Sequence, residues 1–376
     1  MEFFLPIAEV NVSLPFIFFL SLVVGILSGL FGVGGGFLMT PFLIFLGIPP
    51  AYAVPNEANN ILGTSISGST THYLKGTLDY KMGLMIVVGG AMGTILGILT
   101  FTYFQDIGKI NIVISLAYMY ILAIIGTMML VQGVTEIDRA RKKIIVKKKL
   151  HDHNWLQGLP FRMRFKKSKL YESAFTPIIM GFIVGYIAAI LGVGGAFILV
   201  PAMIYIIGMP TKLIPGTSLF VTIFISAIVT ILHAFNYGSI DLFLVIPLIL
   251  GSIVGVQLGQ KLGQFLDSTE LKSLFAMLLL SVSIAIGYDS FFRDKSNVSN
   301  GNQIINTDLN ALAEFTVKFS NDVPFLYGAL AILLAISLGA LAAFARKILS
   351  PVVRKLLSDF RKKEEPQKEE IKFPEK

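Results

Sequence analysis

The chain has 376 residues, of which 54% are apolar and only 14% are charged, against roughly 25% charged residues in soluble domains. The absence of cysteine excludes a disulfide-stabilised secreted scaffold, thiolate metal sites and a cysteine nucleophile. A mean hydropathy of +0.75, a net charge of +8 and 30 Phe exclude a disordered chain and favour an all-α polytopic membrane protein.

The chain begins with a short segment and a broken apolar element. Residues 1–13 contain Glu2 and Glu9 but no basic residue, which is the wrong charge for a signal peptide. Residues 14–30 are apolar, glycines interrupt them at 32–36, and the apolar run resumes over 37–48 only. Because a span needs about 20 apolar residues, we expect these pieces to enter the membrane and return on the same side.

Seven further segments are long enough to span a membrane, or nearly so, and a second broken element separates them. The spans are expected at 57–74, 82–104, 110–133, 213–235, 242–262, 271–288 and 324–345. The second broken element consists of residues 174–190, the sequence Gly-Val-Gly-Gly-Ala at 192–196, and residues 197–208.

The two broken elements belong to an internal duplication. At an offset of 160 residues, Gly32, Gly34 and Gly35 match Gly192, Gly194 and Gly195. At 161, Ser65 and His72 match Ser226 and His233, and at 162, Asp79 matches Asp241. This ordered series of matches predicts two copies of one structural unit.

Two hydrophilic stretches hold 22 of the 31 basic residues. Residues 135–172 contain twelve basic and four acidic residues, and residues 346–376 contain ten basic and six acidic residues. The positive-inside rule predicts that both stretches are cytoplasmic. Only an odd number of spans in each half then leaves few basic residues outside, and an odd number inverts the second half relative to the first.

The predicted fold is therefore two inverted-topology repeats with glycine-broken re-entrant helices and an additional C-terminal transmembrane helix. The expected boundaries are 14–133 for the first repeat, 134–172 for a basic cytoplasmic linker, 173–288 for the second repeat, 289–323 for an external loop, 324–346 for the extra helix and 347–376 for a charged cytoplasmic tail.

The glycine breaks are the candidate binding site. A helix that restarts after a break directs unpaired N–H groups and the positive end of its dipole at the break, and glycine lets an anion approach the backbone. The alternative is that the glycines only permit tight helix packing. The substrate-binding candidates are Gly34, Gly35, Gly36, Asn60, Thr64, Gly194, Gly195, Ala196, Thr217 and Ser218.

The helix after each break is unusually polar. Asn60, Thr64 and Ser67 share one helix face, as do Thr222, Ser226 and Thr230, and hydroxyls and amides can bind an anion without a buried counter-charge. Interhelical hydrogen bonding is the alternative for the hydroxyl groups. Glu57 is expected at the outer mouth, away from mid-depth.

His72 and His233 are candidates for proton coupling, with a helix-end cap as the favoured alternative. The stripes Gly89-x3-Gly93-x3-Gly97 and Gly251-x3-Gly255-x3-Gly259 indicate close helix packing. His151 and His153 in the basic linker are a weak metal signal, so no metal and no cofactor is expected.

The doubled pattern of a span, GVGGG or GVGGA, a short helix ending near Pro, a Ser/Thr-rich span and His…Gly…Asp resembles the sulfite exporter TauE/SafE family. The carrying residues are Phe31 to Phe37, Pro41, Gly47 and Pro49, Ser65 to Gly68, His72, Gly76 and Asp79, Leu191 to Phe197, Pro201, and Pro215 to Ser218. The resemblance implies a carrier for small anions such as sulfite, sulfonates or other organosulfur compounds in a bacterial inner membrane. The long basic linker and the segment 324–345 depart from the family's compact form.

The sequence therefore predicts a secondary transporter, with export as the expected direction, that works by alternating access between its repeats. Its expected partners are a small anion and the lipid bilayer, without nucleic acid, and a homo-oligomer is left open. Two alternatives remain. One is a non-transporting scaffold or channel subunit that acts through the basic linker; the other is a membrane enzyme, for which no convergent acids, histidines or metal ligands are apparent.

Overall fold

The computed structural model describes residues 3–31, 38–141, 160–210, 212–262, 268–292 and 311–364. The first repeat contains α1 (Leu14–Phe31), α2 (Met39–Phe45), α3 (Pro50–Leu74), α4 (Tyr80–Asp106) and α5 (Ile110–Arg141). The second contains α6 (Phe175–Leu191), α7 (Ala196–Tyr205), α8 (Ile214–Tyr237), α9 (Leu242–Leu262) and α10 (Ser268–Phe292). Helices α11 (Ala311–Asp322) and α12 (Pro324–Glu364) follow, so the all-α membrane fold is confirmed.

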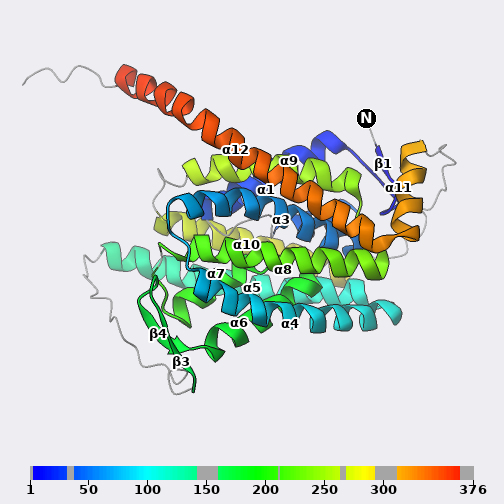
Figure 1. The fold of residues 1–376 in the computed structure, drawn as a ribbon, viewed down its shortest axis with the longest axis horizontal. Helices are drawn as coiled ribbons and strands as arrows, with labels where there is room; N and C mark the ends of the chain where they lie inside the picture. Colours follow the sequence, from blue (N-terminus) through cyan, green and yellow to red (C-terminus); the bar gives the residue numbers. More distant parts are fainter. Residues whose placement is uncertain are drawn as a thin grey trace, which may run out of the picture.

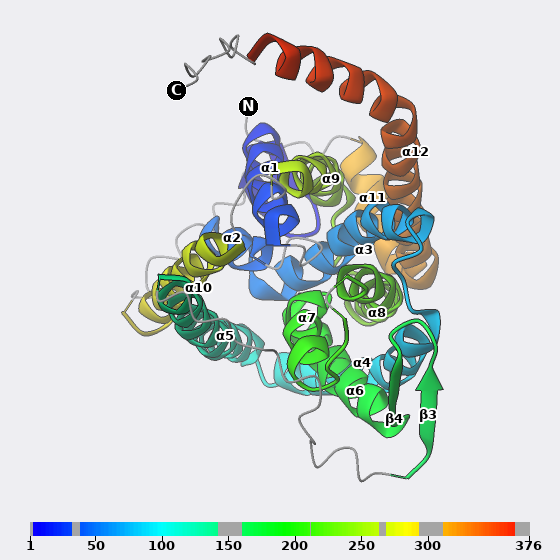
Figure 2. The same ribbon diagram turned by 90° about the vertical axis from the view of Figure 1, so that its left-hand side faces the viewer.

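Five helices of the described chain are long and apolar enough to cross a membrane: Tyr80–Asp106, Ile110–Thr135, Ile214–Tyr237, Leu242–Leu262 and Pro324–Phe344. Shorter apolar helices occupy Leu14–Leu30, Phe175–Leu191 and Ala276–Tyr288. Helix α3 is absent from this set because it is polar. It packs instead among α8, α9 and α12, so other helices shield its amides and hydroxyls (Figure 2).

The repeats are joined crosswise. Helix α1 of the first repeat packs along α9 of the second, and α6 of the second packs along α4 of the first (Figure 2). The pairs α3–α8 and α5–α10 each join equivalent helices. Every one of these contacts crosses from one repeat to the other, so neither repeat forms its core alone.

The glycine stripes make these crosswise contacts. A Cβ built on Gly93 would overlap the carbonyl of Phe182 on α6, and one built on Gly255 would overlap the carbonyl of Leu22 on α1. Backbones that lie this close leave no room for a side chain, which is the packing that small-residue stripes permit in membranes. The packing interpretation of both stripes is thereby confirmed.

Helix α4 has two faces with different roles. Its glycines face α6, whereas Leu84, Val88, Met92 and Leu99 are each more than half exposed on its other side. A long apolar strip of this kind on a soluble protein would be a docking or aggregation site, but here it is the surface suited to lipid.

Two short antiparallel hairpins depart from the all-helical expectation. Strands β1 (Phe3–Leu5) and β2 (Val10–Val12) pair before α1, and β3 (Arg162–Phe165) and β4 (Leu170–Ser173) pair before α6. The hairpins lie at opposite ends of the helix bundle (Figure 1). Strands of three or four residues are too short to leave a detectable period-two pattern in the sequence.

The apolar part of α12, Pro324–Phe344, coincides with the extra transmembrane helix predicted at 324–346. The same helix continues to Glu364, so the first part of the charged tail is helical. Within the membrane region, a Cβ on Gly339 would lie 2.5 Å from the carbonyl oxygen of Gly63, and Asn59 donates to the Ala331 carbonyl at 3.2 Å. The extra helix is therefore packed directly on the polar helix α3.

We expect Gly93→Leu to lower the free energy of unfolding by about 3 kcal/mol or more, since its side chain must separate α4 from α6. Thermal unfolding in detergent would measure the loss. The matched control is Met92→Leu on the exposed face of α4, which should unfold like the wild type. Equal stability of the Gly93 and Met92 variants would contradict the backbone contact.

Candidate functional site

Each repeat places the aspartate of its His…Gly…Asp pattern in a hydrogen-bonded cluster with the hairpin of the other repeat. Asp79, between α3 and α4, accepts from the backbone N–H and the hydroxyl of Ser168 in the β3–β4 turn, at 3.1 and 2.9 Å. Its other carboxylate oxygen accepts from the Met82 N–H and so caps α4. Asp79 and Ser168 are both buried.

Asp241, between α8 and α9, forms the equivalent cluster. Its carboxylate accepts from the N–H groups of Ile7 in the β1–β2 turn and of Phe243, both at 3.1 Å. Burial raises the pKa of the Asp241 carboxyl above its usual range, and these N–H donors offset part of the shift. Both motif aspartates are thus anchors for the opposite repeat's hairpin.

The two aspartate clusters also show how the central helices run. Asp241 N–H donates to Asn56 near the start of α3, and Asp79 N–H donates to Thr217 near the start of α8. Helix α3 therefore runs from the Asp241 cluster towards the Asp79 cluster, and α8 runs the opposite way. The equivalent helices α3 and α8 are antiparallel, and about 27 Å of helix separates Asn56 from Leu74.

The second glycine break has a left-handed backbone that only glycine adopts without strain. Gly192 has φ +69°, Gly194 +62° and Gly195 +77°. Gly192 ends α6 and Gly195 is the N-cap of α7. The predicted interruption of the helix is therefore confirmed, and residues 191–197 are all buried.

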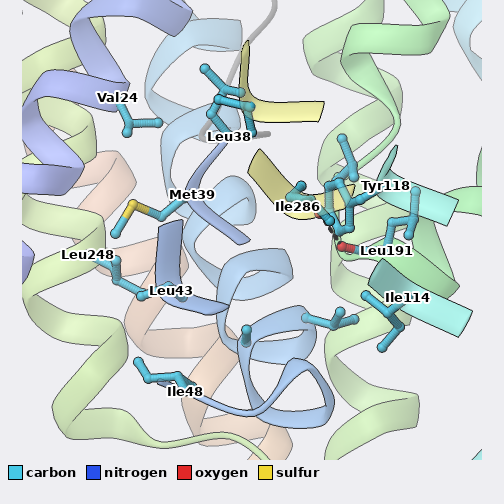
Figure 3. Packing of buried hydrophobic residues seen from close by; sticks show 14 of the residues in the cluster. Val24, Leu38, Met39, Leu43, Ile48, Ile114, Tyr118, Leu191, Leu248 and Ile286 are labelled. Atoms are coloured by element: carbon cyan, nitrogen blue, oxygen red, sulfur yellow. Dashed lines mark hydrogen bonds between the residues drawn. The ribbon is translucent and has the colours of Figure 1, made fainter. Parts of the chain in front are cut away.

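Side chains from two other helices satisfy the carbonyl groups at the end of α6. The Tyr118 hydroxyl of α5 donates to Leu191 O at 2.6 Å (Figure 3). His233 of α8 places Nε2 3.0 Å from Ala189 O, and because a carbonyl only accepts, Nε2 carries the proton. Carbonyl groups at the end of a broken helix need partners inside a membrane, and those of Ala189 and Leu191 have them.

The N–H groups on the other side of the break are not paired. Among the described residues, no acceptor contacts the backbone N–H groups of Val193, Gly194, Gly195 or Ala196. Each buried and unpaired donor costs about 1–3 kcal/mol. Four consecutive donors that lead into the N-terminus of α7 can attract an anion, because the positive end of the helix dipole lies there.

One hydroxyl group of α8, that of Ser226, faces the same break, and Thr222 faces it with its methyl group. A Cβ built on Gly194 would lie 3.0 Å from both Ser226 Oγ and Thr222 Cγ2. Ser226 is fully buried and its Oγ has no hydrogen-bond partner in the described structure. The sequence placed Thr222 and Ser226 on one polar helix face but did not assign them to the site; their i, i+4 spacing was the available signal.

The polar residues of α3 form a second part of the interior. The Asn60 side-chain amide donates to Glu57 Oε2 at 3.0 Å and to Ser252 Oγ at 3.1 Å. Ser252 lies in the middle of α9. Glu57 is 0% exposed, so its expected place at the outer mouth is wrong: the carboxyl lies inside the helix bundle.

The predicted site residues fall into separate groups. Gly194, Gly195 and Ala196 form the break, while Gly34, Gly35 and Gly36 lie outside the described residues. Thr64 is buried, with its hydroxyl bonded to carbonyls of its own helix. Thr217 and Ser218 do not meet Gly194, because Thr217 pairs with Asp79 and Ser218 donates to Pro215 O.

Both histidines contact groups near helix ends. His72 Nδ1 lies 2.9 Å from Thr77 Oγ1 in the turn after α3, and His233 bonds the last turn of α6. These contacts agree with the helix-cap interpretation. The proton-coupling role of His72 and His233 stays a prediction. The described residues contain no group of three or more His, Cys, Asp or Glu side chains that could hold a metal.

The comparison with known families decides the identity. The family model described as "Sulfite exporter TauE/SafE" matches residues 17–286. The chain belongs to this family. It is a multi-pass membrane transporter, as the resemblance read from the doubled glycine pattern predicted.

Three relatives of the chain are each described as a probable membrane transporter protein. "Probable membrane transporter protein YjnA" of Bacillus subtilis is 28% identical over 265 residues, covering 70% of this chain and 96% of the relative. "Probable membrane transporter protein YunE" of the same organism is 24% identical over 281 residues, covering 73% and 97%. "Probable membrane transporter protein MJ0441" of Methanocaldococcus jannaschii is 25% identical over 272 residues, covering 68% and 89%. No solved structure matches the chain.

The aspartate cluster of this TauE/SafE protein can be tested through its stability. Asp79→Ala leaves three buried donors without an acceptor and should lower the free energy of unfolding by about 3 kcal/mol or more. Ser168→Ala removes one of those donors with its bond and should cost only about 1 kcal/mol. Denaturant unfolding of both variants checks the difference. Equal losses would show that the carboxylate is not the centre of the cluster.

Proposed function

We propose that this protein is a secondary transporter of a small anion such as sulfite, a sulfonate or another organosulfur compound, and that the anion binds at the second break. The observation that carries the proposal is that the N–H groups of the buried residues Val193 to Ala196 find no acceptor among the residues that the structure describes. An anion that accepts from them would remove their desolvation penalty and would meet the positive end of the α7 dipole.

The neighbouring hydroxyl groups suit the same ligand. Ser226 can donate to an oxyanion beside Gly194. In this proposal Asn60 and Thr64 join the site only by exchanging their present bonds to Glu57, to Ser252 and to carbonyl groups of α3. Neutral donors bind an anion without the high cost of burying a permanent positive charge. Because residues 191–197 are buried, the structure corresponds in this proposal to an occluded state between uptake and release.

In this proposal the two repeats have inverted topology, and the first break, at Gly34–Gly36, forms the other half of the site. Two observations support this arrangement. The equivalent helices α3 and α8 run antiparallel, and the equivalent aspartate–hairpin clusters lie at opposite ends of the bundle (Figure 1). Ser65, the counterpart of Ser226, is likewise buried with an unpaired hydroxyl.

Alternating access would then use the two aspartate clusters as the closures of the two entrances. Rocking of one repeat against the other would break one cluster while the other holds. We propose a bacterial inner-membrane location with the basic linker and the tail in the cytoplasm, and export as the direction. The partners would be the anion and the bilayer, without nucleic acid; the homo-oligomer has no further support from the structure.

Uptake of labelled sulfite and sulfonates into proteoliposomes tests the proposal. Ser226→Ala removes one charge-assisted hydrogen bond and should raise the KM for the transported anion roughly 10- to 100-fold. Ser281→Ala is the matched control, since Ser281 is exposed on α10 and bonds only Leu278 O. An unchanged KM in a folded Ser226→Ala protein would contradict the site, as would unchanged transport by a folded Gly194→Leu variant.

A further inference from the structure

We infer that Glu57 is a proton-binding site of this transporter, and that it takes up one proton together with each anion. The inference rests on the proposed function and identifies the coupling ion, which the sequence had sought only in histidines. It is carried by the position of the carboxyl group, its unfilled acceptor and its surroundings.

The carboxyl group is isolated from water and only partly satisfied. Glu57 is 0% exposed, and Asn60 Nδ2 donates to its Oε2 at 3.0 Å. Its second oxygen, Oε1, has no partner in the described structure. A protonated carboxyl retains the Asn60 bond and leaves no charge to stabilise, whereas an ionised one would be a buried anion with an empty acceptor.

Among the side chains that the structure places, no cation contacts the Glu57 carboxyl group. Helix α5 contributes Tyr118, whose hydroxyl donates to Leu191 O, and the exposed Tyr120 and Asp138. The titratable side chains placed on the other helices packed against α3 are Tyr186 on α6, His233 and Tyr237 on α8, Lys261 on α9, and Tyr327 on α12. Of these, His233 bonds Ala189 O, and Lys261 is in the last turn of α9. Helix α2 has no titratable residue.

Glu57 also belongs to the part of α3 that lies along the anion site. A Cβ on Gly192 would overlap the Val54 backbone, and one on Gly194 would lie 2.5 Å from Ile61 Cγ2. Val54 and Ile61 are one turn before and one turn after Glu57. Helix α5, which also packs against α3, reaches the same break, because its Tyr118 donates to Leu191, the last residue of α6.

This arrangement couples the two ligands. An ionised Glu57 would repel an anion bound at residues 193–196, and a low-dielectric interior strengthens that repulsion. Binding of the anion therefore favours the protonated carboxyl, and protonation favours the anion, by the reciprocity of linked binding. When the site opens to water, the carboxyl can release its proton with the anion. A monovalent anion would then move with no net charge, and export against an inward pH gradient would require an outward anion gradient steeper than the pH gradient.

The first test detects the proton without requiring transport. At neutral pH, the infrared spectrum of the purified full-length wild type minus that of Glu57→Gln should contain the carbonyl band of a protonated carboxylic acid. The wild type minus the control Asp106→Asn, whose carboxyl is exposed at the end of α4, should not contain it. Absence of the band from the first difference spectrum overturns the inference whatever the protein transports.

The second test measures coupling with methanesulfonate, which stays ionised across the pH range used and carries no proton of its own. In proteoliposomes held at zero membrane potential, the wild type and Asp106→Asn should accumulate it about tenfold per unit of pH difference. Folded Glu57→Gln should equilibrate it without accumulation. Accumulation by Glu57→Gln, or none by a wild type that transports, overturns the coupling. If the wild type transports no sulfonate, the proposed function is wrong for sulfonates, and so is the coupling of a proton to sulfonate transport. The infrared result still decides whether Glu57 is protonated.

Discussion

A backbone N–H or C=O group inside a membrane must find a partner within the protein, and this constraint explains most of the structure. The end of α6 meets it through Tyr118 and His233, which take two of its carbonyl groups. The four N–H groups from Val193 to Ala196, which lead into α7, have no acceptor in the described part of the chain. The asymmetry is informative, because a fold that pairs its carbonyl groups from two other helices could have paired the N–H groups as well. We therefore regard the unpaired side as the ligand's side.

The rest of the fold holds this break in place by crossing between the repeats. Gly93 brings α4 against α6, while Gly255 brings α9 against α1. Asp79 and Asp241 fasten each hairpin to the opposite repeat. A movement of one repeat relative to the other would therefore act on both ends of the bundle and on the break between them. Helix α12, which lies beyond the family match, adds a covering layer over α3 and α8.

The sequence predicted the features that depend on local pattern. The apolar runs located the spans, and the glycine clusters located the breaks, because a helix cannot cheaply continue through several glycines. The duplication predicted that equivalent elements would recur, and the structure contains both sets. The packing role of the stripes at Gly93 and Gly255 followed from their four-residue spacing alone.

The features that depend on long-range contacts could not be predicted in this way. Thr217 was grouped with Gly194 because it belongs to the polar helix that follows the break, yet Thr217 pairs with Asp79 of the other repeat. Glu57 was expected at the outer mouth, and only the packing of α3 among other helices shows that it is buried. Tyr118 sits in an ordinary apolar span, and nothing in its sequence neighbourhood indicates the bond to Leu191.

The most direct test of the central claim is a crystal structure determined with selenite, an anomalously scattering analogue of sulfite. The account predicts an anomalous peak within hydrogen-bond distance of the backbone nitrogens at Gly194 and Gly195 and of Ser226 Oγ, and no peak there in a folded Gly194→Leu variant. Backbone N–H groups at 193–196 that bond protein carbonyls, with the selenite peak elsewhere in the membrane region, would contradict it.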